Sequence, residues 1–81
     1  DLLKEIRKAK FMAGYGLDRI DALDARNLSF YLKNGIEIRI GSENFKERLD
    51  LLGSTLRDPR LVMNMIRYID VRFKDVTIGP K

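Results

Sequence analysis

The sequence predicts an α+β domain in which one or two helices pack on one face of a mostly antiparallel sheet of four to five strands. Two stretches, residues 2–9 and 45–56, place apolar residues at the three- and four-residue spacing of an amphipathic helix. Two others, residues 28–40 and 68–78, alternate apolar with polar residues, as half-buried strands do. The 81 residues contain no internal repeat or linker, so residues 1–81 form a single domain or a fragment of one.

The first predicted helix covers residues 2–9, where leucine, isoleucine and alanine side chains lie opposite a charged side. Asp1 can lie at its amino end, where a negative charge suits the helix dipole. Gly14 and Gly16 are expected to end this helix. Residues 17–23 fit either helical or strand spacing, but the segment is short for a helix, so we predict a strand.

A β-hairpin is predicted over residues 28–40. A two-residue loop at the Asn-Gly pair would split the apolar faces, whereas a three-residue loop over residues 33–35 keeps them together. Gly35 would then take the left-handed conformation that residues with a Cβ rarely adopt. With this loop Leu32 faces Ile36, Phe30 faces Ile38 and Leu28 faces Ile40, while Tyr31 pairs with Glu37 and Ser29 with Arg39 on the exposed side.

A second helix is predicted after Gly41, with Ser42 as its cap. Its apolar stripe, which should lie across the apolar face of the hairpin, consists of Phe45, Leu49, Leu52 and Leu56. Asp58-Pro59 should interrupt this helix, because the residue before a proline avoids helical geometry. Residues 61–66 then form either a short helix started by Pro59 or an apolar connector.

The segment 68–79 is the most strand-like part of the chain. Ile69, Val71 and Phe73 alternate with polar residues, and the phase slips at Lys74-Asp75 before a second short run that contains Val76 and Ile78. We expect this segment to form an edge of the sheet, where unpaired backbone groups either need protection or recruit a partner strand. Charges at Arg72, Lys74 and Asp75 favour protection. Tyr68, Phe73, Val76 and Ile78 favour recruitment, because alternate side chains give specificity to strand addition.

Composition excludes several kinds of chemistry. The chain has neither cysteine nor histidine, which removes disulfides, the usual metal ligands and the common nucleophile-base pairs. We expect no catalytic residue, cofactor or metal, and we expect Asp70 and Arg72 to pair with each other or with a neighbouring strand. No apolar run approaches the roughly 20 residues of a membrane span.

The formal net charge of +4 leaves open an alternative function as a small basic nucleic-acid-binding module. Acidic residues lie beside basic ones throughout, and the only concentration of basic residues is at Arg57, Arg60, Arg67 and Arg72. A solvated surface is therefore the favoured interpretation of these charges.

The succession LSFYLKNGIEIRIGSENFKERLDLLGSTL, followed by YIDVRF, resembles the second half of the β domain of the bacterial cell-division protein FtsQ, called DivIB in Gram-positive species. The matching features are glycines at positions 35 and 41, the helix over residues 45–56, and a strand with an "IDLR" pattern and a following aromatic, here residues 69–73. The resemblance covers roughly residues 20–78. It implies a non-enzymatic scaffold that acts during septum formation.

The resemblance also implies partners and a place in the cell. Partners would be FtsB/DivIC- and FtsL-like division proteins, with the FtsB-type partner adding a β-strand beside the "IDLR" element. This carries over to Asp70, Arg72 and Phe73, and less directly to Val76 and Ile78. A membrane helix and a POTRA domain would precede this part, which would lie on the periplasmic or extracellular side. The family often has tyrosine where Phe73 stands, and the terminal strand here has no tryptophan. Missing strands would leave a second edge open to self-association.

Overall fold

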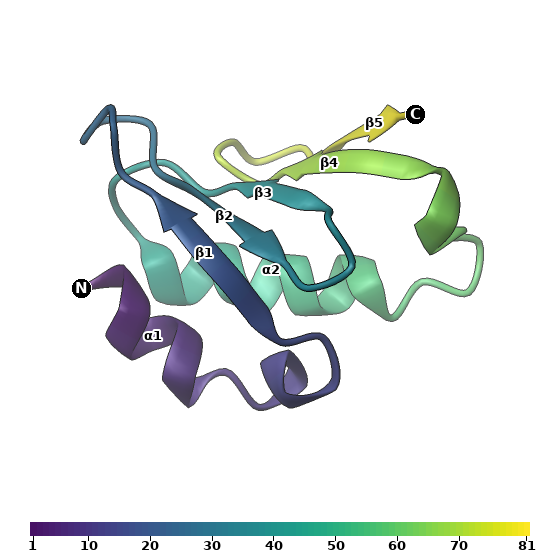
Figure 1. Cartoon of the computed structure of the whole chain (residues 1–81), viewed down its shortest axis with the longest axis horizontal. Helices are drawn as coiled ribbons and strands as arrows, with labels where there is room; N and C mark the ends of the chain where they lie inside the picture. The colour runs from purple at the N-terminus through teal and green to yellow at the C-terminus, as the bar shows by residue number, and fades with distance from the viewer.

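In the computed structural model, which describes residues 1–81, a single five-stranded sheet has two α-helices packed on one of its faces (Figure 1). The spatial order of the strands equals their order in the sequence, β1-β2-β3-β4-β5. All neighbouring strands are antiparallel except β3 and β4, which are parallel. The predicted α+β class with a mostly antiparallel sheet is therefore confirmed. The elements are α1 (Leu2–Lys8), β1 (Leu17–Asp21), β2 (Ser29–Leu32), β3 (Glu37–Arg39), α2 (Phe45–Leu56), β4 (Ile66–Asp70) and β5 (Thr77–Pro80), with 3-10 turns at Lys10–Gly14 and Met63–Met65.

The β2–β3 hairpin has the predicted three-residue loop. Phe30 lies opposite Ile38 and Tyr31 opposite Glu37, as the apolar alternation required. Gly35 has a φ of 94°, and its amide donates to the Leu32 carbonyl at 2.9 Å. The positive φ explains why glycine stands at this position.

The amino-terminal part is confirmed in outline, with one correction. The Asp1 carboxylate caps α1 by accepting a hydrogen bond from the Lys4 amide at 2.9 Å. The predicted strand at residues 17–23 exists as β1, which pairs with β2. However, α1 ends at Lys8 rather than at Gly14, and the chain continues through a 3-10 turn.

The second helix follows the predicted stripe, but its start was wrongly predicted. Ser42 does not cap α2; Asn44 occupies the cap position with a φ of 57°, and no side chain bonds the first turn. Asparagine tolerates this left-handed conformation better than most residues, which lets the chain turn sharply from β3 into the helix. The helix ends at Leu56, before Asp58-Pro59 as predicted. Residues 61–65 form a connector with one 3-10 turn instead of a helix begun by Pro59, and Ile66 is the first residue of β4.

The carboxyl-terminal segment forms two strands joined by the turn expected at Lys74-Asp75. β4 lies between β3 and β5, so it is an interior strand, and the two edge strands of the sheet are β5 and β1. The expectation that the edge begins at Tyr68 was wrong, since only the second short run lies there. Phe73 does not continue the apolar face either, because β4 ends at Asp70 and the Phe73 side chain is 64% exposed.

The core fills the space between the helices and one face of the sheet. Ile69 on β4 and Leu52 on α2 are both fully buried in it. The opposite face of the sheet carries no helix, so its polar and aromatic side chains remain accessible. The largest fully buried side chains are Phe30, Leu32, Ile38, Ile40, Leu52, Ile69 and Val71.

Candidate partner-binding site

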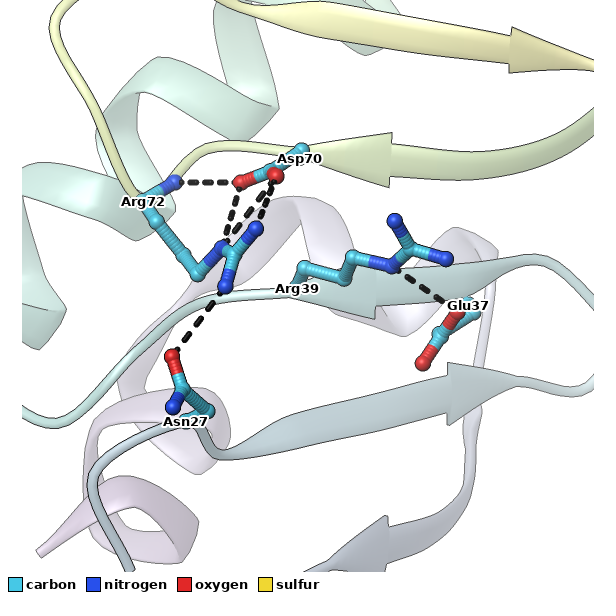
Figure 2. Close-up of polar contacts among 5 residues, drawn as sticks. All are labelled: Asn27, Glu37, Arg39, Asp70 and Arg72. Carbon is cyan, nitrogen blue, oxygen red and sulfur yellow. Dashed lines mark hydrogen bonds and ion pairs between the residues drawn. The ribbon is translucent and has the colours of Figure 1, made fainter. Parts of the chain in front are cut away.

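The carboxylate of Asp70, at the end of β4, holds Arg72 two residues later (Figure 2). Arg72 Nη2 lies 2.7 Å from Asp70 Oδ2, and Arg72 Nε donates to Oδ1 at 3.0 Å. The Arg72 backbone amide donates to the same Oδ1 at 3.0 Å. The predicted pairing of these residues is confirmed, and its bidentate geometry fixes the direction in which the chain leaves β4.

This pair also sets the charge state of the site. Burial raises the pKa of Asp70, but hydrogen bonds from the side chain and backbone of Arg72, with the attraction of Arg72 and Arg39, outweigh it and hold the pKa below its usual value. The hydrogen bond to Asp70 in turn raises the pKa of Arg72. The pair therefore remains ionised at neutral pH and provides no acid or base suited to proton transfer.

Arg72 connects three loops that are distant in the sequence. Its Nη1 donates to Asn27 Oδ1 at 3.1 Å, just before β2 (Figure 2). Its stem lies against Gly41, just after β3, where a Cβ would stand 3.5 Å from Arg72 Cγ. Arg72 thus anchors the connector between β4 and β5 to the end of the β2–β3 hairpin.

A row of side chains crosses the helix-free face of the sheet. The register places Arg19, Tyr31, Glu37, Tyr68 and Gly79 opposite one another on the five strands. The Arg39 guanidinium lies 3.7 Å from the centroid of the Tyr68 ring, and Arg39 Nε donates to Glu37 Oε1 at 3.1 Å. Such a cation–π contact holds the aromatic ring in one position, and the Tyr68 ring in turn occupies the space that a side chain at Gly79 would need.

The outer side of β5 is an open sheet edge. The Lys81 amide donates to the Met65 carbonyl, on the β4 side, at 3.0 Å. Backbone groups point to alternate sides along a strand, so Gly79 and Thr77 also face β4, and the amide and carbonyl of Ile78 face outward. Pro80 has no amide hydrogen and leaves no unpaired donor at the end of this edge.

Apolar side chains are exposed on β5 and on the connector between β4 and β5. Phe73 is 64% exposed and Ile78 is 39% exposed, whereas Val76 is half-buried against the core. Beside Phe73 and Arg72 the surface has a hollow of about 150 Å³ whose other walls include Arg48 and Asn27. Of the six predicted binding residues, four therefore lie on β5 or its connector, while Tyr68 and Asp70 lie on the interior strand β4.

Sequence reasoning missed three contributors to this region: Asn27, Arg39 and Gly79. Asn27 lies 45 residues from the arginine it binds, and nothing in the local sequence indicates that contact. Gly79 had a signal, since a glycine within a strand often marks close approach of another group. Arg39 was placed on the exposed side of the hairpin, but its stacking depends on the pairing of β3 with β4.

Comparison with known protein families decides which proteins this chain is related to. The family model described as cell division protein FtsQ/DivIB, C-terminal, matches residues 1–72. The chain belongs to the FtsQ/DivIB family. No curated protein matches it.

Membership of the FtsQ/DivIB family gives the protein a role in cell division. Proteins of this family are membrane-anchored scaffolds of division and are not known as enzymes. Neither helix of this chain has the length and hydrophobicity needed to cross a bilayer. The matched range ends at Arg72, so β5 and its exposed side chains lie just beyond it.

Proposed function

We propose that this FtsQ/DivIB-type domain recruits an FtsB/DivIC- or FtsL-type division protein by accepting a β-strand of that partner along the outer side of β5. The open edge of β5, with the outward amide and carbonyl of Ile78, is the observation that carries the proposal. The domain would act on the periplasmic or extracellular side of the membrane, as a scaffold without catalysis.

The six candidate residues take different roles in this proposal. Ile78 supplies backbone hydrogen bonds and an exposed apolar side chain, and Phe73 and Val76 contact the apolar side chains of the added strand. Tyr68 lies against Gly79 and supports the edge from the interior strand. Asp70 and Arg72 hold the connector that presents Phe73, since their ion pair is mostly buried.

The edge is short, which favours a partner that also makes side-chain contacts. Only Ile78 offers an outward donor within Thr77–Pro80, so main-chain pairing contributes few hydrogen bonds. The exposed Phe73 ring, beside Arg72 at 5.2 Å from the guanidinium carbon to the ring centroid, provides a larger anchor. We therefore expect most of the binding free energy to come from Phe73 and its surroundings.

The alternative function, a basic nucleic-acid-binding module, has less support. Arg60 Nη2 lies 2.7 Å from Asp58 Oδ2, and Arg72 is equally close to Asp70. Arg60, one of the three arginines expected to bind nucleic acid (Arg57, Arg60 and Arg67), and Arg72 in the same basic concentration are therefore already paired with carboxylates. Phosphate binding would have to compete with both pairs.

Binding of the soluble part of the FtsB- or DivIC-type partner, measured by calorimetry, tests the proposal. Phe73→Glu should weaken binding by roughly tenfold or more, because a charge replaces an exposed apolar anchor. Ile78→Pro should also weaken it, because proline removes the outward amide. Leu23→Glu is the matched control, since Leu23 is 97% exposed and does not line the hollow beside Phe73.

Circular dichroism should show an unchanged fold in Phe73→Glu and Leu23→Glu, because both side chains are mostly exposed. Equal affinity of wild type, Phe73→Glu and Ile78→Pro would contradict strand addition at β5. Sedimentation that reveals dimers sensitive to Ile78→Pro, without partner binding, would instead indicate that the edge pairs with a second copy.

A further inference from the structure

A hollow of about 430 Å³ lies between α1 and α2, on the helix layer of the domain. The two helices lie side by side there (Figure 1). A volume of this size falls within the range of ligand-binding clefts. No residue of β4 or β5 lines the hollow; its walls consist of Glu5, Lys8, Ala9, Lys10, Phe11, Lys46, Leu49, Asp50 and Arg57.

The floor of the hollow is apolar. Ala9 and Phe11 are half-buried against the core, and Leu49 belongs to the core itself. Phe11 approaches α2 at Gly53, where a Cβ would stand 3.0 Å from Phe11 Cδ1. Glycine within a helix is less favourable than alanine, but here its lack of a side chain gives room for the ring that forms the floor.

The rim of the hollow is cationic. Four of the lining side chains are lysine or arginine and two are carboxylates, which gives a net charge of +2. Lys8 Nζ lies 3.7 Å from Glu5 Oε2, and Lys46 Nζ lies 3.3 Å from Asp50 Oδ2. No carboxylate lies within ion-pairing distance of Lys10 or Arg57, so these two cations are available to a ligand.

We propose that this hollow is a second docking site, which binds an acidic peptide segment of a partner protein through at least one large apolar side chain and flanking carboxylates. The apolar floor receives the side chain, and Lys10 and Arg57 pair with the carboxylates. This site goes beyond strand addition at β5 and shares no residue with it, so either proposal can fail without the other.

A peptide fits this surface better than other anions. A small anion such as phosphate would leave the apolar floor unused. An anionic bilayer would cover the whole helical face around the hollow. Its negative charge would then come close to the carboxylate of Asp50, whose side chain is 70% exposed, and the two would repel. A peptide can place its carboxylates next to Lys10 and Arg57 alone, which is the selectivity that charge complementarity gives.

The probe is the synthetic peptide acetyl-Glu-Glu-Leu-Phe-Glu-Glu-amide, titrated into the ¹⁵N-labelled chain and followed by two-dimensional NMR. We expect saturable shifts of the backbone amides of Ala9, Phe11, Leu49 and Arg57, without shifts at Ile78 on β5. Two altered peptides test the two parts of the site. Replacing all glutamates by glutamine should weaken binding, because the peptide loses its charge contacts with the cationic rim. Replacing the Leu-Phe pair by Ser-Ser should also weaken binding, because the peptide loses its apolar contacts with the floor.

The protein variant Lys10→Glu/Arg57→Glu should bind the peptide roughly tenfold more weakly, because two attractive charge contacts become repulsive. The matched control is Arg67→Glu/Lys74→Glu, which changes the net charge equally at two exposed residues outside the hollow. This control should stay within about twofold of wild type, since long-range charge effects alone are screened by salt. Circular dichroism checks that both variants are folded.

Three results would overturn this proposal. One is the absence of peptide-induced shifts in the hollow at millimolar peptide. The second is equal weakening by both double variants, which would mean a general charge effect. The third is sedimentation of the chain with vesicles of phosphatidylcholine and phosphatidylglycerol, lost in Lys10→Glu/Arg57→Glu, without peptide binding; this would identify a membrane surface as the ligand.

Discussion

The ring of Tyr68 on β4 occupies the space beside Gly79, the residue directly opposite it on β5. Arg39 stacks on the same ring from β3, so the aromatic side chain links three neighbouring strands. The strand β5, which carries the proposed partner-binding edge, is therefore held in place partly by the contact of the Tyr68 ring with Gly79.

Gly79→Ala should lower the free energy of unfolding by about 1–3 kcal/mol, because the added methyl group displaces the Tyr68 ring from a packed position. Urea denaturation followed by circular dichroism measures this change. In a Tyr68→Ala background the same substitution should cost much less, because the clash is gone. Equal costs in the two backgrounds would mean that Tyr68 is not the reason for glycine at position 79.

Gly35→Ala should cost about 1–2 kcal/mol through backbone strain alone. The position has open space around it, but its φ of 94° is unfavourable for a residue with a Cβ. Gly14→Ala is the control, since Gly14 also has open space but no positive φ. Thermal unfolding of both variants separates the strain of a positive φ from the general effect of replacing glycine by alanine. A loss of stability in Gly14→Ala equal to that in Gly35→Ala would contradict the role of φ.

Acid should destabilise the protein below about pH 4. The pKa of Asp70 is lower in the folded protein than its usual value. The stabilisation that the ionised Asp70 carboxylate gives the folded protein is therefore complete above the unfolded-chain pKa of about 3.9. It is lost as pH falls through the pKa of Asp70 in the folded protein. Asp58 contributes to the same loss of stability at low pH, since the hydrogen bond from Arg60 lowers its pKa to about 2.

Asp70→Asn should flatten this acid dependence, measured as the free energy of unfolding between pH 2 and pH 6. It should also lower stability at pH 7 by about 1–3 kcal/mol, because Arg72 loses its charged partner. Asp75→Asn removes a carboxylate from the same connector and serves as the control for loss of one charge. An unchanged slope in Asp70→Asn would show that the pair with Arg72 does not contribute to acid unfolding.

The helix caps give a further test. Asp1→Ala should cost about 0.5–2 kcal/mol, because the Lys4 amide loses its acceptor. Ser42→Ala should change stability by less than about 0.5 kcal/mol, since Ser42 is exposed and does not cap α2. Chemical denaturation of the two variants compares them directly, and a larger loss in Ser42→Ala would contradict the observed cap at Asn44.

Sequence reasoning succeeded where interactions are local. The register of the hairpin follows from the alternation of Phe30 with Tyr31 and from the loop length, which involve neighbours in the chain. It failed at Phe73, because alternation alone does not show where a strand leaves the sheet. The chain turns away from β4 at Arg72, whose guanidinium binds Asp70 and Asn27, and that turn exposes the aromatic ring.

By itself, the sequence determined the helix stripes, the hairpin, the order of the elements and the resemblance that the family match confirms, because periodicity and turn residues act over a few positions. Only the tertiary structure decided that β4 is interior, that β5 is an edge strand, and that four cations, on α1, on α2 and in the residues that directly follow each helix, gather around one hollow. Parallel pairing of β3 with β4 and the packing of α1 beside α2 join segments far apart in the chain. Such contacts depend on the folding of the whole chain and leave no local pattern in the residues that make them.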